Sequence, residues 1–257
     1  MSNLPLRHDR GTALVTGGAQ RIGRAIVLAL AQRGYAVAIH AHRSRSAAEH
    51  LAGEIRSGGG LAGIVMADLS DHADVERLVP AAAAIGPLTL LVNNASDFEP
   101  NEIGRLDRQL WDRHFAVNLR APIFLAEAFA RIALANADAS IVNVLDQRVR
   151  KLTPQFFSYT LTKSALFTAT TTLAQALAPK VRVNAVAPGP TFESARQTPA
   201  DFAAQIAALP LAKGPDPQEI AEAVVYLAGA RSVTGETIAV DGGQHLAWRT
   251  PDIDIRE

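Results

Sequence analysis

The sequence predicts one α/β domain, built on a doubly wound parallel sheet of about seven strands with helices on both faces. The chain has 257 residues, of which 48% are hydrophobic, so it can bury a large core. Folds of this class and length commonly form a single domain, here expected over 1–257. Short apolar runs alternate with helix-length segments, and most runs are too continuously apolar for strands with one exposed side. This pattern indicates a parallel sheet covered on both faces.

Seven apolar runs are expected to form the strands. They are TALVTG (12–17), YAVAIH (35–40), LAGIVMADL (61–69), LTLLVNNAS (88–96), ASIVNVLD (139–146), VRVNAVAPG (181–189) and ETIAVDGG (236–243). Helix-length segments lie between them, near 22–33, 44–57, 71–85, 106–132, 155–178 and 217–229. This repeated strand–helix–strand order predicts the doubly wound sheet. No linker-like composition break and no internal repeat divides the chain.

One segment interrupts the alternation. Residues 189–215 contain four prolines and a short amphipathic piece. Because an insertion beyond the carboxyl end of a strand lies next to the ligand crevice of such a sheet, we expect a substrate lid here.

Composition limits the kinds of partner. Lys and Arg number 25 and Asp and Glu also number 25, so the formal net charge is zero and nothing pulls the protein toward nucleic acid or an anionic membrane. The absence of cysteine excludes disulfides and thiolate chemistry. The N-terminal MSNLPLRHDR has no apolar signal segment, and the uncharged stretch 164–179 is too short to span a bilayer. We expect a cytosolic protein whose partners are small molecules and copies of itself.

The first strand leads into a glycine-bearing turn and an apolar-periodic helix, in ALVTGGAQRIGRAIVLAL (13–30). The N–H groups of such a turn and of the helix N-terminus can hold a pyrophosphate, provided that Gly17 and Gly23 let the backbones approach closely. A tight turn alone is the alternative explanation. The position of this motif at the start of the β-α-β pattern favours a dinucleotide site in a Rossmann-type sheet.

The end of the second strand indicates which dinucleotide is bound. A site that selects NAD usually places an acid there, but the segment AIHAHRSRS (38–46) has none before Glu49. A 2′-phosphate would instead meet His42, Arg43, Ser44 and Arg45, whose donors suit a dianion. The sequence therefore predicts NADPH. We interpret His40 and His42 as ordinary polar surface and expect no metal site.

A tyrosine and a lysine form the candidate catalytic pair. Tyr159 and Lys163 stand at i and i+4, which places them on one face of a helix. Near an ammonium and the positive charge of a nicotinamide, the pKa of a phenol should fall toward neutrality, so that it can donate and accept a proton. Asp146 lies thirteen residues before the tyrosine, at the end of an apolar run. A tyrosine packed against a solvated lysine is the alternative.

With these motifs the chain resembles the short-chain dehydrogenase/reductase family over nearly its whole length. The resemblance rests on TGGAQRIG (16–23), ADL (67–69), NNAS (93–96), VNLRAP (117–122), the Tyr159/Lys163 pair, VNAVAPG (183–189) and VTGETIAVDGG (233–243). It implies that Asp68 contacts adenine, that Asn93 lies along the cofactor, that Asn118 holds a water in the proton relay, and that Lys163 binds the nicotinamide ribose. The cofactor residues that it implies together with these are Gly17, Arg21, Ile22, Gly23, His42, Arg43, Ser44, Leu69, Ala95, Ser96, Tyr159, Pro188 and Gly189.

Two departures from the common family pattern are informative. Arg21 stands where a glycine is usual, and Asp146 stands where the catalytic serine is usual. Both resemble the pteridine reductases, as does the segment IHAHRSRSAAE (39–49), and NNASDFEP (93–100) places Phe98 where those enzymes stack the pterin ring. The segments DQRV (146–149) and VTGETIAVDGGQHL (233–246) look closest to the bacterial dihydromonapterin reductase branch. The resemblance thus implies a substrate site of Arg21, Ser96, Phe98, Asp146 and Tyr159.

These observations favour NADPH-dependent reduction of a dihydropterin, with dihydrofolate as a second candidate substrate. Pterin ring nitrogens must be protonated, and an aspartate beside Tyr159 can orient the phenol, help relay a proton and bind pterin N–H groups. The alternative is a carbonyl or 3-oxoacyl reductase in which Asp146 only caps a strand end. A non-catalytic NADPH-sensing module is a third interpretation, against which Asn118, Tyr159 and Lys163 argue together. The resemblance also implies a homo-oligomer, expected to be a homotetramer, with a dimer as the alternative. The uncharged helix near 164–179 is consistent with an interface between subunits, and packing inside one subunit is the other explanation.

Overall fold

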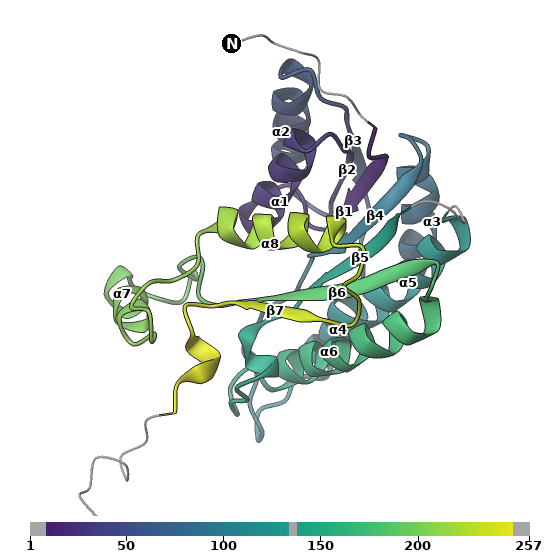
Figure 1. The fold of residues 1–257 in the computed structure, drawn as a ribbon. Coiled ribbons are helices and arrows are strands. Elements are labelled where there is room, and N and C mark those ends of the chain that lie inside the picture. The colour runs from purple at the N-terminus through teal and green to yellow at the C-terminus, as the bar shows by residue number, and fades with distance from the viewer. Residues whose placement is uncertain (1–8, 134–137, 249–257) are drawn as a thin grey trace, which may run out of the picture.

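The computed structural model describes residues 9–133 and 138–248 and confirms the predicted fold class (Figure 1). Seven parallel strands form one sheet in the order β3-β2-β1-β4-β5-β6-β7. The strands are β1 (Thr12–Val15), β2 (Ala36–Ala41), β3 (Ala62–Met66), β4 (Leu88–Asn93), β5 (Ala139–Val144), β6 (Val181–Pro188) and β7 (Thr237–Val240). Six of the strands fall inside their predicted runs, while β2 extends one residue beyond its run, to Ala41.

The helices also lie where the sequence predicts them, except for a short additional helix formed by the amphipathic piece of residues 189–215. They are α1 (Arg21–Gln32), α2 (Arg45–Ser57), α3 (His72–Ala83), α4 (Arg108–Phe115), α5 (Ala121–Ile132), α6 (Phe157–Leu177), α7 (Pro199–Ala207) and α8 (Pro217–Gly229). One expected helix differs. The segment 106–132 is α4 and α5 joined by a π-helical turn, η1 (Ala116–Arg120). Such turns are frequent at functional sites, and this one carries Asn118.

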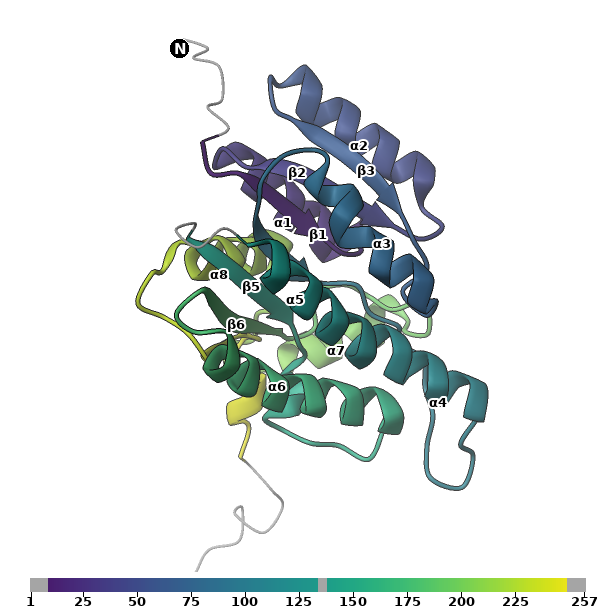
Figure 2. The same cartoon turned by 90° about the vertical axis from the view of Figure 1, so that its right-hand side faces the viewer.

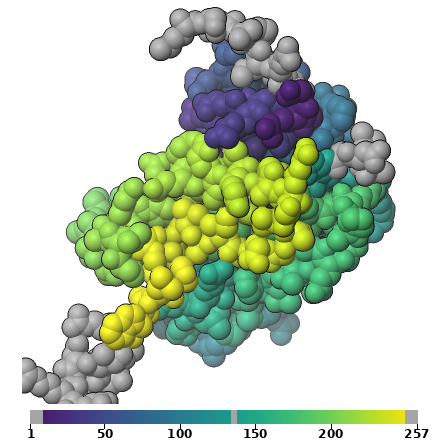
Figure 3. All heavy atoms as spheres, in the orientation of Figure 1, coloured from purple at the N-terminus to yellow at the C-terminus, as the bar shows by residue number. Residues whose placement is uncertain are grey.

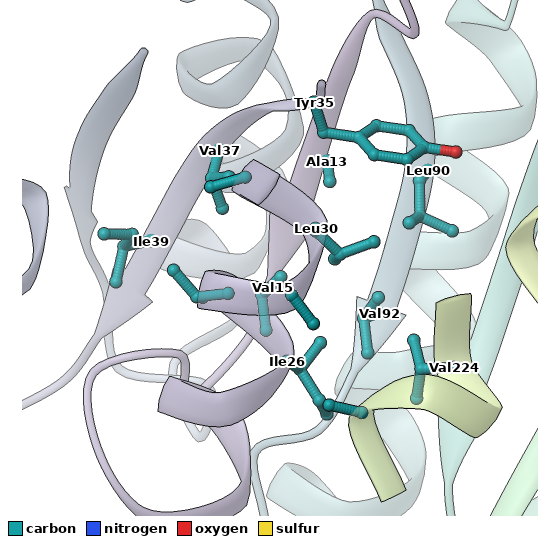
Figure 4. Packing of buried hydrophobic residues seen from close by; sticks show 14 of the residues in the cluster. Ala13, Val15, Ile26, Leu30, Tyr35, Val37, Ile39, Leu90, Val92 and Val224 are labelled. Carbon is teal, nitrogen blue, oxygen red and sulfur yellow. The ribbon is translucent and has the colours of Figure 1, made fainter. Parts of the chain in front are cut away.

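The alternating side chains of the strands divide the core into two layers. Ala13 and Val15 of β1 face α1, α2 and α8, and Figure 4 shows them packed with Ile26 and Leu30 of α1. Leu14, between them, faces the layer that α3, α5 and α6 form. In Figure 2 these three helices lie in front of the sheet. Both faces are therefore covered, which explains why the strands are apolar on both sides.

The strand order sets the position of the crevice. β1 pairs with β2 on one side and with β4 on the other. The chain therefore adds β2 and β3 on one side of β1 and then crosses to add β4 and the later strands on the other side. A crevice opens at the carboxyl ends of the strands at such a switch point. The expected lid lies beyond the carboxyl end of β6, where α7 and the segments around it stand out from the body as a separate lobe (Figures 1 and 3).

Within residues 9–133 and 138–248, no helix is both long enough and apolar enough to cross a membrane. Most of the N-terminal segment 1–10, used above to exclude a signal sequence, lies outside the described residues. The cytosolic location and the homotetramer stay predictions.

The core predicts one measurement. Phe129 of α5 is fully buried and is among the largest side chains of the core. Phe129→Ala should lower the free energy of unfolding by about 3–5 kcal/mol, because the lost apolar burial adds to the cost of the cavity. Phe124→Ala is the matched control on the same helix, since Phe124 is 42% exposed; it should cost less than about 1 kcal/mol. Equal losses in urea unfolding would show that the layer between α3 and α5 is loosely packed.

Candidate active site

A first pocket follows the carboxyl ends of β1, β2 and β4 and has a volume of about 590 Å³, within the usual range for ligand sites. Most of the residues predicted to bind the cofactor line it. They are Gly17, Arg21, Ile22, Gly23, His42, Arg43, Ser44, Asp68, Leu69, Ala95 and Ser96. The tertiary structure thus brings together segments that are up to eighty residues apart in the sequence.

The turn between β1 and α1 is built for close backbone approach. Gly17 has a φ of +61°, a conformation that favours glycine. A Cβ on Gly23 would lie 2.1 Å from the carbonyl oxygen of Gly17, so no other residue fits there. Gln20 precedes α1 without capping it through its side chain, and the first turn of α1 holds no acid. The N–H groups at this helix end can therefore donate to an anion.

The end of β2 presents the predicted basic segment to the same pocket. Arg43 is exposed and Ser44 is half-buried, and the Ser44 hydroxyl donates to Gln20 Oε1 over 3.4 Å. His42 Nε2 lies 3.4 Å from Asp68 Oδ2. Arg45, also considered for the phosphate, does not line the pocket, and its Nη1 is 3.8 Å from Glu49 Oε1 within α2.

The interpretation of His40 as polar surface is wrong. His40 is only 2% exposed and joins two backbone segments of the first pocket. Its Nδ1 accepts a hydrogen bond of 3.0 Å from the backbone N–H of Gly17, which fixes the tautomer, so Nε2 donates to the carbonyl oxygen of Ala67 over 3.1 Å. Burial lowers the pKa of His40 from 6.5 to about 4. A neutral histidine thus holds the phosphate-binding turn against the end of β3.

A second pocket of about 570 Å³ adjoins the first. It lies between the end of β5, the start of α6 and the lid segment. The predicted site residues that line it are Arg21, Ile22, Ser96, Phe98, Asp146, Tyr159, Lys163, Pro188 and Gly189. Arg21, Ile22 and Ser96 line both pockets, so the two cavities meet at these residues. A molecule in one pocket can therefore reach a molecule in the other.

Asp146 and Tyr159 are in direct contact in this second pocket. The Tyr159 hydroxyl donates to Asp146 Oδ2 over 3.0 Å. Asp146 follows β5 and Tyr159 lies in the first turn of α6, so the twelve intervening residues return the chain to the same place. The carboxylate is thus oriented at the phenol, beyond its function as the N-cap of the short turn η2 (Gln147–Val149).

The expected fall in the pKa of Tyr159 does not occur in the protein alone. Burial, and then the negative charge of Asp146, raise the pKa of Tyr159 well above 10. Lys163 is also buried, which lowers its pKa from 10.5 to about 8, and its Nζ donates to the carbonyl oxygen of Val144 over 2.8 Å. Lys163 nevertheless lies on the predicted side, with its Nζ 5.8 Å from the centroid of the Tyr159 ring.

Phe98 lines the second pocket as predicted, but one of its faces is already covered. Its ring stacks on Phe156, with centroids 4.3 Å apart and planes inclined by 12°, and meets the Tyr159 ring edge-on at 4.7 Å. Phe156 precedes α6 with a φ of +53°, a strained conformation for an aromatic residue. The aromatic wall is therefore a pair of rings, and Phe156 had no signal in the sequence.

Two asparagines lie outside both pockets. Asn93, expected along the cofactor, is buried, and its Nδ2 donates to Asn143 Oδ1 over 2.9 Å. Asn118, expected to hold a relay water, is fully buried in η1, where its Oδ1 accepts from the backbone N–H of Asp97 over 2.7 Å. Both asparagines therefore support the loops and strands around the site through buried hydrogen bonds, without lining a pocket. The relay water stays a prediction.

Asn94, the next residue of the same motif, is the asparagine that reaches the pockets. It lines both pockets, and its Nδ2 donates to the carbonyl oxygens of Thr16 and Gly17 over 2.9 and 3.1 Å. The second asparagine of the NNAS motif was a signal for this residue. The direction of each side chain depends on how the turns pack, which the motif alone does not reveal.

The lid segment reaches over the second pocket. Arg196 lies 2.9 Å from Glu99 through Nη1 and donates to the carbonyl oxygen of Phe98 through Nη2 over 3.1 Å. Phe192, Gln197 and Gln205 line the pocket from the same segment. These contacts tie residues 189–215 to the loop that carries Phe98.

The fold and the two joined pockets define a nucleotide-dependent oxidoreductase of the α/β class. A family model described as Enoyl-(Acyl carrier protein) reductase matches residues 17–245. A 3-oxoacyl-[acyl-carrier-protein] reductase, FabG, from Staphylococcus aureus is 31% identical over 241 residues, which cover 91% of this chain and 98% of that protein. The chain belongs to the short-chain dehydrogenase/reductase family.

Two solved structures are more similar still. The crystal structure of FolM alternative dihydrofolate reductase 1 from Brucella canis, complexed with NADP, is 53% identical with a TM-score of 0.92, and the match covers 97% of this chain and 99% of that one. FolM alternative dihydrofolate reductase 1 from Brucella suis, in complex with NADP, is 55% identical with a TM-score of 0.91 and covers 94% and 97%. The suspected pteridine reductase-like branch is thereby confirmed as the part of the family that this chain resembles.

The buried His40 predicts a pH dependence of stability. Its pKa is lower in the folded protein than its ordinary value of 6.5, so the folded state favours the neutral ring, and its contribution is complete above about pH 6.5. As the pH falls toward 4, the unfolded chain takes up a proton that the folded chain refuses, which should cost about 1.4 kcal/mol per pH unit and about 3 kcal/mol in total.

The measurement is urea unfolding of the parent and of His40→Leu between pH 7 and pH 4. The parent should be the more stable of the two at pH 7, and the difference should narrow as the pH falls, because only the parent carries the titrating ring. Since His114 is present in both proteins, its own titration cancels. Parallel stability curves would show that His40 does not titrate in this range.

Proposed function

We propose that the protein reduces a dihydropterin to its tetrahydro form with NADPH. Supporting this are the two joined pockets, the similarity to NADP-bound alternative dihydrofolate reductases, and the aspartate that replaces the usual serine. The observation that carries the proposal is the hydrogen bond of 3.0 Å between the Tyr159 hydroxyl and Asp146 Oδ2, at the wall of a pocket that Phe98 also lines.

The first pocket fits NADPH. The uncapped start of α1 and the close approach of Gly23 to Gly17 suit a pyrophosphate. Arg43 and His42 lie at the end of β2, where the 2′-phosphate would be placed. The meeting of the two pockets at Arg21 and Ser96 supports a nicotinamide end that lies beside the substrate.

When bound, NADPH supplies the hydride. The protein supplies the proton and the orientation: Tyr159 donates toward a ring nitrogen of the pterin, and Asp146 orients the phenol and accepts from pterin N–H groups. Lys163, held by the carbonyl oxygen of Val144, binds the nicotinamide ribose. Phe98 and Phe156 offer flat apolar surface to the heterocycle, and Arg196 ties the lid to that wall.

A substrate panel tests the proposal. NADPH oxidation should be fast with dihydromonapterin, dihydrobiopterin or dihydrofolate and slow with acetoacetyl thioesters. The reverse order would favour the second candidate, a carbonyl or 3-oxoacyl reductase, for which the 31% identity to a 3-oxoacyl reductase is the specific support. NADPH binding without turnover of either class would favour a sensing module.

Asp146→Ser separates the two enzyme activities, because it restores the common family pattern. A hydroxyl supplies neither the charge nor the second oxygen of the carboxylate, so dihydropterin turnover should fall by about 10²–10⁴. Tyr159→Phe should cost a similar factor, and the double variant much less than the product if the two groups act as one relay. NADPH binding, measured by fluorescence, should survive both changes. Full dihydropterin activity in the serine variant would contradict the proposal.

The basic segment predicts the coenzyme preference. NADPH should bind at least about tenfold tighter than NADH, since one charge-assisted contact is worth roughly 1.5–3 kcal/mol. Arg43→Ala should narrow this gap. Arg45→Ala is the matched control, because Arg45 lies two residues further on and points to Glu49; it should keep the gap. Equal dissociation constants for the two coenzymes in the parent would overturn the assignment.

A further inference from the structure

Arg148 lies within the second pocket, and neither the motifs nor the proposed reaction gives it a task. It belongs to the short turn η2 after β5 and follows Asp146 by two residues. Its side chain is 19% exposed and that of Asp146 is 16% exposed. The pair is therefore largely withdrawn from solvent, where each partner strongly affects the other.

The contacts of Arg148 converge on Asp146. Its backbone N–H donates to Asp146 Oδ1 over 2.8 Å. Its guanidinium Nη1 donates to both oxygens, Oδ1 at 3.3 Å and Oδ2 at 3.1 Å. With the Tyr159 hydroxyl, every group that meets the carboxylate is a donor, so Asp146 acts purely as an acceptor. These bonds also leave the carboxylate little freedom to rotate away from Tyr159.

The guanidinium is itself held in place by the aromatic wall. Its Cζ lies 5.4 Å from the centroid of Phe98 and 5.2 Å from that of Phe156, which are distances of a cation–π contact. Arg148 thus contacts both the two rings and the carboxylate. Arg148 connects the surface that would hold the substrate ring to the group that orients the phenol.

The charge of Arg148 acts directly on Tyr159. Burial is the largest cause that raises the pKa of Tyr159, and the charge of Asp146 adds to it. The positive charge of Arg148 opposes both and lowers the pKa of Tyr159. It acts in the direction that the sequence assigned to Lys163. A carboxylate beside the phenol without this cation would hold the phenolic proton more tightly.

We propose that Arg148 is a positioning residue of the proton-transfer step, an inference that rests on the dihydropterin reduction proposed above. Its guanidinium fixes the Asp146 carboxylate toward the Tyr159 hydroxyl and offsets the carboxylate charge there. Since it acts through Asp146, its importance should depend on the presence of that carboxylate.

The test compares Arg148→Met, Arg148→Lys and Arg148→Met in an Asp146→Asn background, in steady-state turnover with whichever substrate the parent reduces. Methionine keeps an apolar stem beside the rings but removes the charge and the donors. Arg148→Met should lower kcat by about 10-fold to 100-fold, with KM changed less than about threefold. Arg148→Lys should recover part of kcat, because it restores the charge but not the two-point contact.

The double variant shows whether the effect of Arg148→Met on kcat depends on the Asp146 carboxylate, which a purely structural role of Arg148 would not require. In the Asp146→Asn background, Arg148→Met should change kcat less than about threefold, because the carboxylate that it positions is gone. Arg150→Met is the matched control: Arg150 is exposed, lies two residues further on and donates to the carbonyl oxygen of Thr237 over 2.7 Å, so its removal should leave kcat unchanged.

Three outcomes overturn the proposal: an unchanged kcat in Arg148→Met, a rise in KM alone, or an equal loss of kcat with and without the Asp146 carboxylate. Retained NADPH binding shows that a variant is folded. If Arg148→Met does not bind NADPH, then Arg148→Lys in both backgrounds decides by the same comparison. A parent that reduces ketones and not dihydropterins refutes the proposed function alone, because the coupling of Arg148 to Asp146 is still measured with the ketone.

Discussion

The site depends on one junction of hydrogen bonds between the first and fourth strands. The Thr16 hydroxyl accepts from the backbone N–H groups of Asn94 and Ala95 over 2.9 and 3.0 Å. Asn94 returns two hydrogen bonds to the carbonyl oxygens of Thr16 and Gly17. This exchange locks the turn that binds phosphate to the loop that leads to Phe98. Because both segments leave adjacent parallel strands at the switch point, the distance between the two pockets is set by the sheet itself.

Buried amides extend this support to the helix that carries the catalytic pair. Asn93 donates to Asn143, and Asn143 donates to Thr170 over 3.0 Å, which joins β4, β5 and α6 in one chain of hydrogen bonds. Nearer the substrate pocket, His114 Nδ1 lies 2.6 Å from Ser158 Oγ, next to Tyr159 in the sequence. Buried polar networks of this kind specify one arrangement of a core, since any slip leaves further buried donors without partners.

Opposite charges also lie close together around Tyr159. A phenol buried beside a carboxylate holds its proton tightly, so the fold supplies cations nearby. Arg148 is paired with Asp146, and Lys163 Nζ lies 5.8 Å from the centroid of the Tyr159 ring, with a pKa lowered to about 8 by burial. These groups come from β5, from the turn after it and from α6. Their combined effect follows from distances that exist only in the folded chain.

The sequence by itself determined the fold class, the helices and strands within a few residues, and seventeen of the residues that line the two pockets. It could do so because apolar periodicity and glycine turns are local properties, and because Tyr159 and Lys163 share a helix face by spacing alone. The tertiary structure decided the rest. His40 is buried and neutral and joins two backbone segments, and Asn93 and Asn118 are buried outside the pockets. Packing stacks Phe156 on Phe98 and pairs Arg148 with Asp146. Side-chain direction, burial and pKa depend on neighbours that are remote in the sequence, so no local pattern contains them.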